Sequence, residues 1–151
     1  MASGTRRPLK RPSAFWDASA LVPLYVTQQS TREVSALYQA YDVVVWWTTP
    51  VEIASAFARL LRMNYLDVST WRQSLDEVLD EAQEWSVLPP TAAIRGKAIE
   101  VVGRYDLRAA DALQLAAALE WCNEQPPGHK FITTDKKLRD AAMLCGFDTL
   151  T

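Results

Sequence analysis

The 151-residue chain has few of the residues that build several common kinds of site. Its two cysteines, Cys122 and Cys145, lie far apart and form no CxxC or Cys/His spacing, so we expect neither a disulfide framework nor a zinc site. The only histidine is His129, which leaves a histidine-dependent mechanism almost nothing to work with. The five glycines are scattered and form no glycine-rich phosphate loop.

Long apolar runs and an excess of charge are also missing. The longest apolar stretch, residues 109–119, is interrupted by Asp111 and Gln114 and falls well short of the roughly 20 residues of a membrane span. Sixteen basic and eighteen acidic side chains give a formal net charge of -2, so any basic surface for nucleic acid must be local. The charged N-terminus is not followed by an apolar core of signal-peptide type. We therefore expect a cytoplasmic protein with no membrane partner.

Length and composition favour a single domain. With 49% hydrophobic residues, a chain of this size can fill one sizeable core. Residues 1–12 contain four basic side chains and two prolines, a composition typical of a disordered basic arm. The sequence therefore predicts one domain over residues 13–151, preceded by that arm.

Strand-like and helix-like segments alternate along the chain. Apolar and β-branched runs predict strands at residues 13–16, 43–47, 86–88, 130–134 and 147–150, the last of them at a sheet edge. Helical periodicity predicts helices over residues 17–25, 31–41, 49–64, 67–85, 91–105, 108–123 and 136–144. This alternation implies βαβ units, so the predicted fold is a three-layer α/β/α sandwich with a mainly parallel central sheet.

Four acidic residues stand where an apolar stretch meets the start of a predicted helix: Asp17, Glu52, Asp111 and Asp135. Taken singly, each could simply cap its helix, and Glu52 fits a capping box with Thr49. Strand-to-helix junctions can also meet at the carboxyl edge of a parallel sheet, where open α/β folds bind ligands. Four carboxylates gathered there would repel one another, and a hard cation such as Mg²⁺ or Mn²⁺ would relieve the repulsion. We therefore hypothesise a metal site shared by these four residues.

The segments around these residues resemble the PIN domain family, including the VapC-type toxins of toxin–antitoxin pairs. They read FWDASALVPLY (15–25), TPVEIASAF (49–57), LRAADALQLA (107–116) and FITTDKKL (131–138). Their order and spacing agree with the family over residues 13–149. The resemblance implies an Mg²⁺- or Mn²⁺-dependent ribonuclease with an RNA substrate and a cognate antitoxin protein as partner. It makes Asp17, Glu52, Asp111 and Asp135 the metal-binding and catalytic residues. Two positions depart from the family: Pro23 stands where a lysine is frequent, and Gln114 where a histidine is common.

Other side chains could support this chemistry. The hydroxyls of Ser19 and Thr133 could orient the carboxylates, or could be ordinary turn hydroxyls. Arg108, Lys136 and Lys137 could bind substrate phosphates. Arg108 could equally neutralise Asp111, and the lysines could form a solvated helix face. Trp46 and Trp47 adjoin a predicted buried strand and are expected in the core.

Two other functions remain open at this point. A PIN-like module could bind RNA or a protein partner without catalysis. A phosphatase of the haloacid dehalogenase type would need a second aspartate two residues after Asp17, where Ser19 stands. A homodimer is also possible, since Val34, Leu37, Tyr38 and the helix at 67–85 supply apolar faces.

Overall fold

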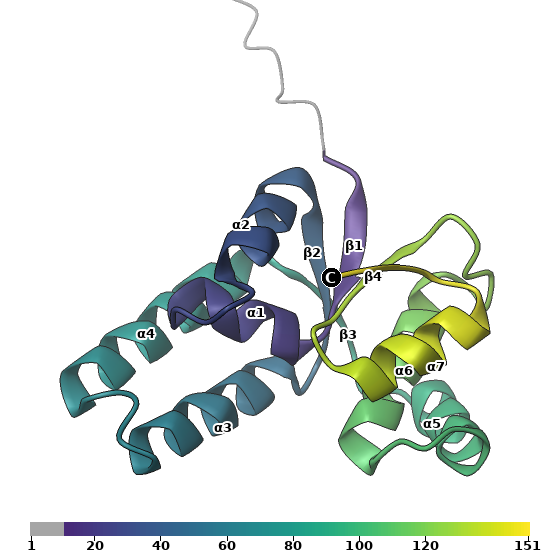
Figure 1. Ribbon diagram of the computed structural model, residues 1–151. Helices are drawn as coiled ribbons and strands as arrows, with labels where there is room; N and C mark the ends of the chain where they lie inside the picture. Colours follow the sequence, from purple (N-terminus) through teal and green to yellow (C-terminus); the bar gives the residue numbers. More distant parts are fainter. Residues whose placement is uncertain (1–10) are drawn as a thin grey trace, which may run out of the picture.

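The computed structural model describes residues 11–151, which form a five-stranded sheet with helices on both faces (Figure 1). The strands are β1 (Ser13–Trp16), β2 (Asp42–Trp46), β3 (Ser86–Leu88), β4 (Lys130–Ile132) and β5 (Asp148–Leu150). All neighbouring strands are parallel, in the order β3-β2-β1-β4-β5. The predicted α/β sandwich with a parallel sheet is confirmed, and the last strand lies at an edge as expected.

The helices follow the predicted periodicity closely. They are α1 (Ala18–Tyr25), α2 (Thr31–Ala40), α3 (Thr49–Arg62), α4 (Val68–Glu81), α5 (Ala92–Arg104), α6 (Ala109–Trp121) and α7 (Lys136–Cys145). The largest difference is at α4, which ends at Glu81 and is followed by a 3₁₀ turn, η1 (Ala82–Glu84). Trp85 was predicted to be part of this helix and lies outside it. Trp85 is buried there, and its indole Nε1 donates to Tyr38 Oη at 3.2 Å. No helix in residues 11–151 is long and apolar enough to cross a membrane.

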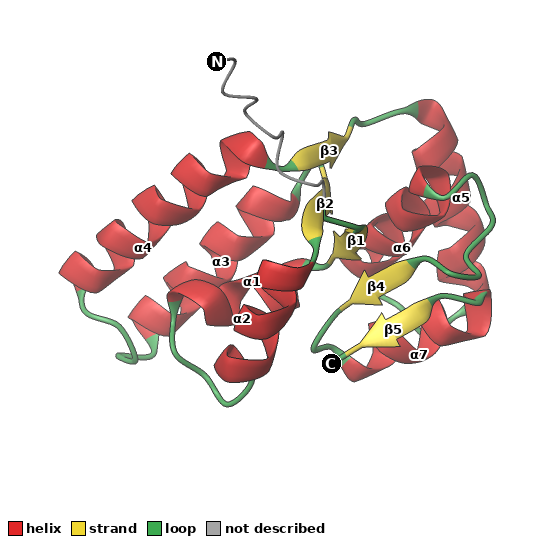
Figure 2. Cartoon of the chain, turned by 90° about the horizontal axis from the view of Figure 1, so that it is seen from above, coloured by secondary structure: helices red, strands yellow, loops and turns green. Residues whose placement is uncertain are grey.

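The side chains of the sheet alternate between two halves of the core. On β1, Ala14 and Trp16 pack with α1 to α4, whereas Phe15 packs on the other face with α5 to α7. Phe131 of β4 stacks on Phe15, with ring centroids 5.4 Å apart. Figure 2 shows the two groups of helices on opposite sides of the strands. Because both faces are covered, the strands read as nearly continuous apolar runs.

The loop between β2 and α3 differs in two ways from the sequence-based expectation. Trp47 was predicted to lie in the core, but its side chain is 57% exposed. It follows Trp46, the last residue of β2, and therefore lies beyond the part of the strand that is covered by helices. The N-cap of α3 is Thr48 rather than Thr49, and it makes no side-chain capping bond. The predicted capping box is therefore wrong. Thr49 lies inside the helix and is fully buried.

The predicted basic arm falls almost wholly outside the described residues, which begin at Arg11. Arg11 itself is held against the domain. Its Nε lies 3.0 Å from Asp42 Oδ1, and its Nη1 donates to the backbone oxygens of Tyr38 and Gln39. These bonds join Arg11 to the end of α2 and the start of β2.

The order in which strands are added to the sheet changes side at β1. Strands β2 and β3 are added on one side of β1, and β4 and β5 on the other. At such a switch point the loops leaving two adjacent parallel strands diverge, which opens a crevice at their carboxyl ends. The loops that begin at Asp17 and Thr133 therefore border a natural place for a ligand.

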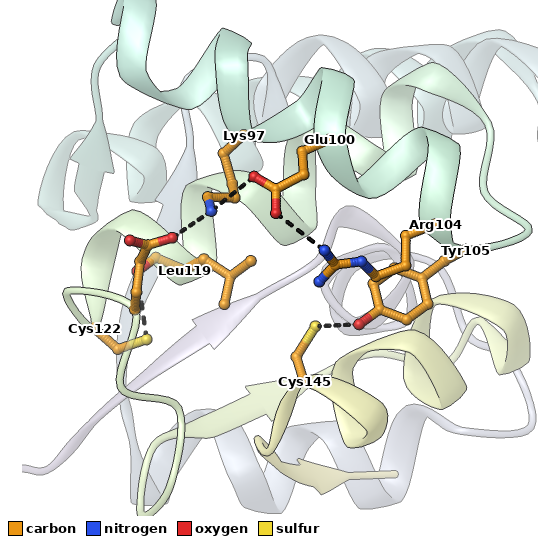
Figure 3. A network of polar contacts seen from close by, with 8 residues as sticks. Lys97, Glu100, Arg104, Tyr105, Leu119, Cys122 and Cys145 are labelled. Atoms are coloured by element: carbon orange, nitrogen blue, oxygen red, sulfur yellow. Dashed lines mark hydrogen bonds and ion pairs between the residues drawn. The ribbon is translucent and has the colours of Figure 1, made fainter.

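A polar network ties together α5, the end of α6 and the end of α7 (Figure 3). Lys97 forms ion pairs with Glu100 and with Glu124, which follows α6. Cys145 Sγ lies 3.4 Å from Tyr105 Oη, linking the last turn of α7 to the residue that ends α5. Both cysteines are free thiols.

A second set of polar bonds fastens α4 to α1 and α2. The carboxylate of Glu81 accepts hydrogen bonds from Tyr25 Oη at 2.8 Å and from Tyr38 Oη at 2.6 Å. Val34 and the half-buried Leu37 pack in the same half of the core. The faces of α2 and α4 that we expected to be available for a dimer are therefore largely used within the chain.

Replacing Glu81 with alanine should loosen α4 from the domain. Two phenol hydroxyls would lose their acceptor, so we expect the free energy of unfolding to fall by about 1–2 kcal/mol in urea titrations followed by circular dichroism. Asp80→Ala is the matched control, because Asp80 is exposed and makes no side-chain hydrogen bond within the described residues. Equal losses in both variants would show that the Glu81 bonds do not stabilise the fold.

Candidate functional site

Asp17 and Asp135 follow two adjacent strands and begin two helices. Each is the N-cap of its helix: Asp17 accepts a hydrogen bond from Ser19 N, and Asp135 from Leu138 N. The backbone of β1 pairs with that of β4 so that Trp16 is opposite Ile132, and Asp17 N donates to Ile132 O at 3.0 Å. Sheet register therefore fixes Asp17 beside the loop that carries Asp135.

Two hydroxyl groups hold one oxygen of Asp17. Ser19 Oγ donates to Asp17 Oδ2 at 2.5 Å, and Thr133 Oγ1 donates to the same oxygen at 3.0 Å. Each hydroxyl also accepts a backbone N–H, Ser19 from Thr134 and Thr133 from Asp135. The residues predicted to orient a carboxylate thus both contact Asp17, which is 5% exposed.

Pro23 contributes indirectly to the same site. It lies inside α1, and a proline has no N–H to donate to the carbonyl four residues earlier, that of Ser19. In its place Thr134 Oγ1 donates to Ser19 O at 3.1 Å. The missing helical bond is therefore replaced by one that joins α1 to the loop after β4.

Glu52 reaches the site from the first turn of α3. Its Oε2 accepts a hydrogen bond from Gln114 Nε2 at 2.6 Å and from Thr48 Oγ1 at 3.3 Å. Gln114 lies in α6 and also donates to Thr49 Oγ1 at 3.2 Å. These bonds connect helices that cover opposite faces of the sheet, around the end of β2.

Asp111 lies in the first turn of α6, on one wall of a cleft of about 510 Å³. Asp135 lines the same cleft together with Arg108 and Lys137. Lys137 Nζ forms a 2.9 Å ion pair with Asp106 at the rim. Lys136 is not among the residues that line the cleft, and it pairs with Asp140 along α7 instead. Of the three residues predicted to bind phosphate, Arg108 and Lys137 therefore line the cleft, and Lys136 does not.

The four carboxylates are close enough to influence one another's ionisation. Burial raises the pKa of Glu52 to about 7, and the charges of Asp17 and Asp111 add to the increase. Burial also raises the pKa of Asp111 to about 6, helped by the charges of Asp135 and Asp17 and opposed by Arg108. The pKa of Asp17 is raised mainly by burial, against the lowering effect of its two hydroxyl partners. Burial and repulsion between neighbouring carboxylates therefore both disfavour the charged forms of these three side chains.

The donor atoms suit a hard divalent cation, although the side chains do not converge on one point. Within residues 11–151, no three acidic, histidine or cysteine side chains are arranged to hold a single ion. Hydrogen bonds engage Oδ2 of Asp17, Oε2 of Glu52 and Oδ1 of Asp135, but no donor in that part of the chain engages the second oxygen of any of them. Each carboxylate thus has one anchored and one open oxygen. An all-oxygen set of this kind fits Mg²⁺ or Mn²⁺, which would draw the open oxygens together.

Three residues of the site were not identified as contributors from the sequence. Thr48 was assigned no role, and Thr134 was assigned none either, because its contact depends on a proline far away in the chain. Gln114 was noted only as a departure from the family. A signal was present, since Gln114 is the single amide in an apolar stretch and lies one helical turn after Asp111.

Comparison with known proteins places this geometry in context. The family model of the PIN domain matches residues 14–144. No curated protein has a sequence that matches the chain significantly.

Several solved structures have a similar fold. A toxin–antitoxin complex from Klebsiella pneumoniae is 15% identical, with a TM-score of 0.63 over 92% of this chain and 97% of that chain. FitAcB from Neisseria gonorrhoeae is 18% identical, with a TM-score of 0.61 over 89% and 96%. VapC20 from Mycobacterium tuberculosis, a sarcin–ricin loop cleaving toxin, is 17% identical, with a TM-score of 0.62 over 85% and 95%. At these identities the likeness concerns the fold.

The raised pKa values predict how stability depends on pH when no metal is present. In the folded chain the pKa values of Glu52 and Asp111 are about 7 and about 6, above their ordinary values of 4.5 and 3.8. The folded state therefore binds these protons more tightly, and the resulting stability is lost as pH rises through 6 and 7. We expect the melting temperature in EDTA to fall by about 2–4 °C between roughly pH 5 and pH 8 because of these groups, with solvent screening keeping the change small.

Asp111→Asn isolates the effect of the cluster, because it removes one of the repelling charges. This variant should melt at a higher temperature than the wild type at about pH 8 in EDTA, and its melting temperature should depend less on pH. Differential scanning fluorimetry can measure both. A wild-type protein that becomes steadily more stable from about pH 5 to pH 8 would contradict the repulsion described here.

Proposed function

The chain belongs to the PIN domain family, and we propose that it is a metal-dependent endoribonuclease that acts as the toxin of a toxin–antitoxin pair. The observation that carries this proposal is the gathering of Asp17, Glu52, Asp111 and Asp135 at the carboxyl edge of the sheet, where burial, with the charges of neighbouring carboxylates added to it, raises the pKa values of Asp17, Glu52 and Asp111. Such a cluster destabilises the fold unless it binds a cation, so its presence favours a functional role.

The proposed cofactor is Mg²⁺ or Mn²⁺, held by the open oxygens of the four carboxylates. Bound there, it would polarise the scissile phosphate and lower the pKa of a water molecule near phosphorus. The neighbouring residues hold the carboxylates in position. Ser19 and Thr133 fix Asp17, and the backbone N–H of Leu138 fixes Asp135.

The proposed substrate is RNA, with its backbone in the cleft that Asp111 and Asp135 line. Arg108 and Lys137 stand on that cleft and are the residues we assign to phosphate contacts. Their placement beside the carboxylates would bring a phosphate to the acidic cluster despite the net negative charge of the chain. Lys136, on the outer face of α7, would act at most at longer range.

The proposed partner is an antitoxin protein. A toxin–antitoxin complex is among the structures with a similar fold. On this chain an apolar groove of about 180 Å³ runs between α5 and α6, where Ile99 and Val102 are exposed. Ala109, which lines the groove, is two residues before Asp111 in the sequence. A partner segment that fills the groove could therefore reach the acidic site with a basic side chain. A second copy of the chain is the competing occupant.

The purified protein should cleave RNA in the presence of Mg²⁺ or Mn²⁺ and should lose this activity in EDTA. Asp111→Asn removes one carboxylate charge and keeps a side chain of nearly the same size and shape. We expect it to lower the rate of cleavage of a single-stranded RNA on the order of 100-fold or more, measured with a fluorescence-quenched substrate.

Asp76→Asn provides the matched control, since Asp76 is an exposed aspartate on α4, outside the site. It should cleave at the wild-type rate. If the wild type binds RNA but neither cleaves it nor binds Mn²⁺ in calorimetry, the chain is a binding module without catalysis. Turnover of small phosphomonoesters in place of RNA would support a phosphatase.

Arg108→Ala should weaken RNA binding through the loss of one phosphate contact. In an Asp111→Asn background, which prevents cleavage, fluorescence anisotropy should show several-fold lower affinity for a single-stranded RNA. The slope of log K against log salt should become shallower by about 0.7. Arg72→Ala on α4 should change neither quantity. An unchanged slope would mean that Arg108 only neutralises Asp111.

A further inference from the structure

Gln114 is an unusual residue for its surroundings. It is 0% exposed and lies in α6 among alanines and leucines that are buried or half-buried. Its Nε2 donates to Glu52 Oε2 at 2.6 Å and to Thr49 Oγ1 at 3.2 Å, so both amide hydrogens are used. Its Oε1 is fully enclosed and has no hydrogen-bond partner within the described residues.

The orientation of this amide follows from its contact with Glu52. If the amide were turned over, its oxygen would face the carboxylate oxygen at 2.6 Å, and two acceptors would repel each other. When Glu52 is ionised the nitrogen therefore points to it, and the amide oxygen is left without a donor. The charge on Glu52 thus explains why the unpaired atom of Gln114 is the oxygen.

Packing alone does not account for a glutamine at this position. An enclosed acceptor without a donor destabilises a core, and an apolar side chain of similar size would avoid that cost. The favourable contribution of the amide is at the carboxylate, where it donates a short hydrogen bond and carries no charge of its own. The bond also occupies only Oε2, which leaves Glu52 Oε1 without a hydrogen-bond donor within the described residues.

We propose that Gln114 is a positioning residue that holds Glu52 by its Oε2 and so presents Oε1 as a ligand for the cation; the inference rests on the proposed nuclease function. Glu52 stands on α3 and is only half-buried, so without this bond its side chain could turn toward solvent. Thr49 fixes the amide in turn. The chain Thr49, Gln114, Glu52 therefore sets the direction of one carboxylate from two helices.

The experiment compares Mn²⁺ binding by the wild type and by Gln114→Met, which keeps the length of the side chain and removes its donors. Calorimetry should show Mn²⁺ affinity reduced about 10- to 100-fold, the usual effect of losing a group that orients a ligand. RNA cleavage should fall by a similar factor at limiting Mn²⁺ and should largely recover at saturating Mn²⁺, because Glu52 itself is still present. A purely structural role would alter neither the affinity nor this dependence on metal concentration in a folded protein.

Two further variants keep the test decisive if Gln114→Met fails to fold. Gln114→Asn retains an amide but is one methylene too short to reach Glu52, so it should lose affinity as Gln114→Met does. Gln114→His places a ring N–H at a similar reach and should restore Mn²⁺ affinity to within about threefold of the wild type. Ser74→Ala is the matched control, since Ser74 is a buried polar residue on α4, away from the site, and its loss should leave Mn²⁺ binding unchanged.

The outcomes separate this inference from the proposed function. Wild-type Mn²⁺ affinity in Gln114→Asn or Gln114→Met, with a wild type that cleaves RNA, would overturn the role of Gln114 alone. A wild type that neither binds Mn²⁺ nor cleaves RNA would overturn both. Weaker binding in those two variants, with recovery in Gln114→His, would establish the role.

Discussion

The repulsion among four carboxylates at one edge of the sheet is the constraint on which the rest of this structure depends. Each of them is anchored through one oxygen by hydroxyl, amide or backbone donors, or, for Asp111, compensated by the nearby Arg108. These donors are themselves held by other polar groups. The hydroxyl, amide and backbone donors around the site therefore keep these carboxylates in place at the edge of the sheet.

The two layers of helices contribute to the site in different ways. The layer of α1 to α4 supplies Asp17 and Glu52, and the layer of α5 to α7 supplies Asp111 and Asp135. The sheet fixes the first and last of these through the pairing of β1 with β4, whereas the bond between Gln114 and Glu52 spans the two layers directly. The geometry of the site is thus sensitive to how the layers sit against each other, which the alternating side chains of β1 and β2 determine.

Sequence periodicity was sufficient to predict the fold because helices and buried strands have strong local patterns of apolar residues. The strand at 13–16 and the helix at 31–41 were predicted to within a residue, since apolar spacing and strand length define them locally. Sequence periodicity was not sufficient to predict side-chain contacts that depend on strand register or on loop geometry. Trp47 was misplaced because the sequence does not show where β2 ends, and Thr49 was read as a cap although its hydroxyl faces Gln114. The four acidic positions stand out in the sequence because each lies at the N-cap or in the first turn of a helix, but the orientation of Asp17 and Glu52 depends on distant partners such as Thr133 and Gln114.

Pro23 illustrates how a residue without a polar side chain can shape a polar site. Because it leaves the Ser19 carbonyl without its helical donor, that carbonyl accepts from Thr134, in the loop that also carries Asp135. Positions 23 and 134 are therefore complementary although they lie 111 residues apart (134 − 23). A residue with a backbone N–H at position 23 could donate to the Ser19 carbonyl itself, so the Thr134 hydroxyl would no longer be needed there. A side chain without a hydroxyl at position 134 would leave that carbonyl without a donor. Natural variants of this chain should accordingly tend to exchange the two residues together, which would make covariation between them a signature of this way of joining α1 to its neighbouring loop.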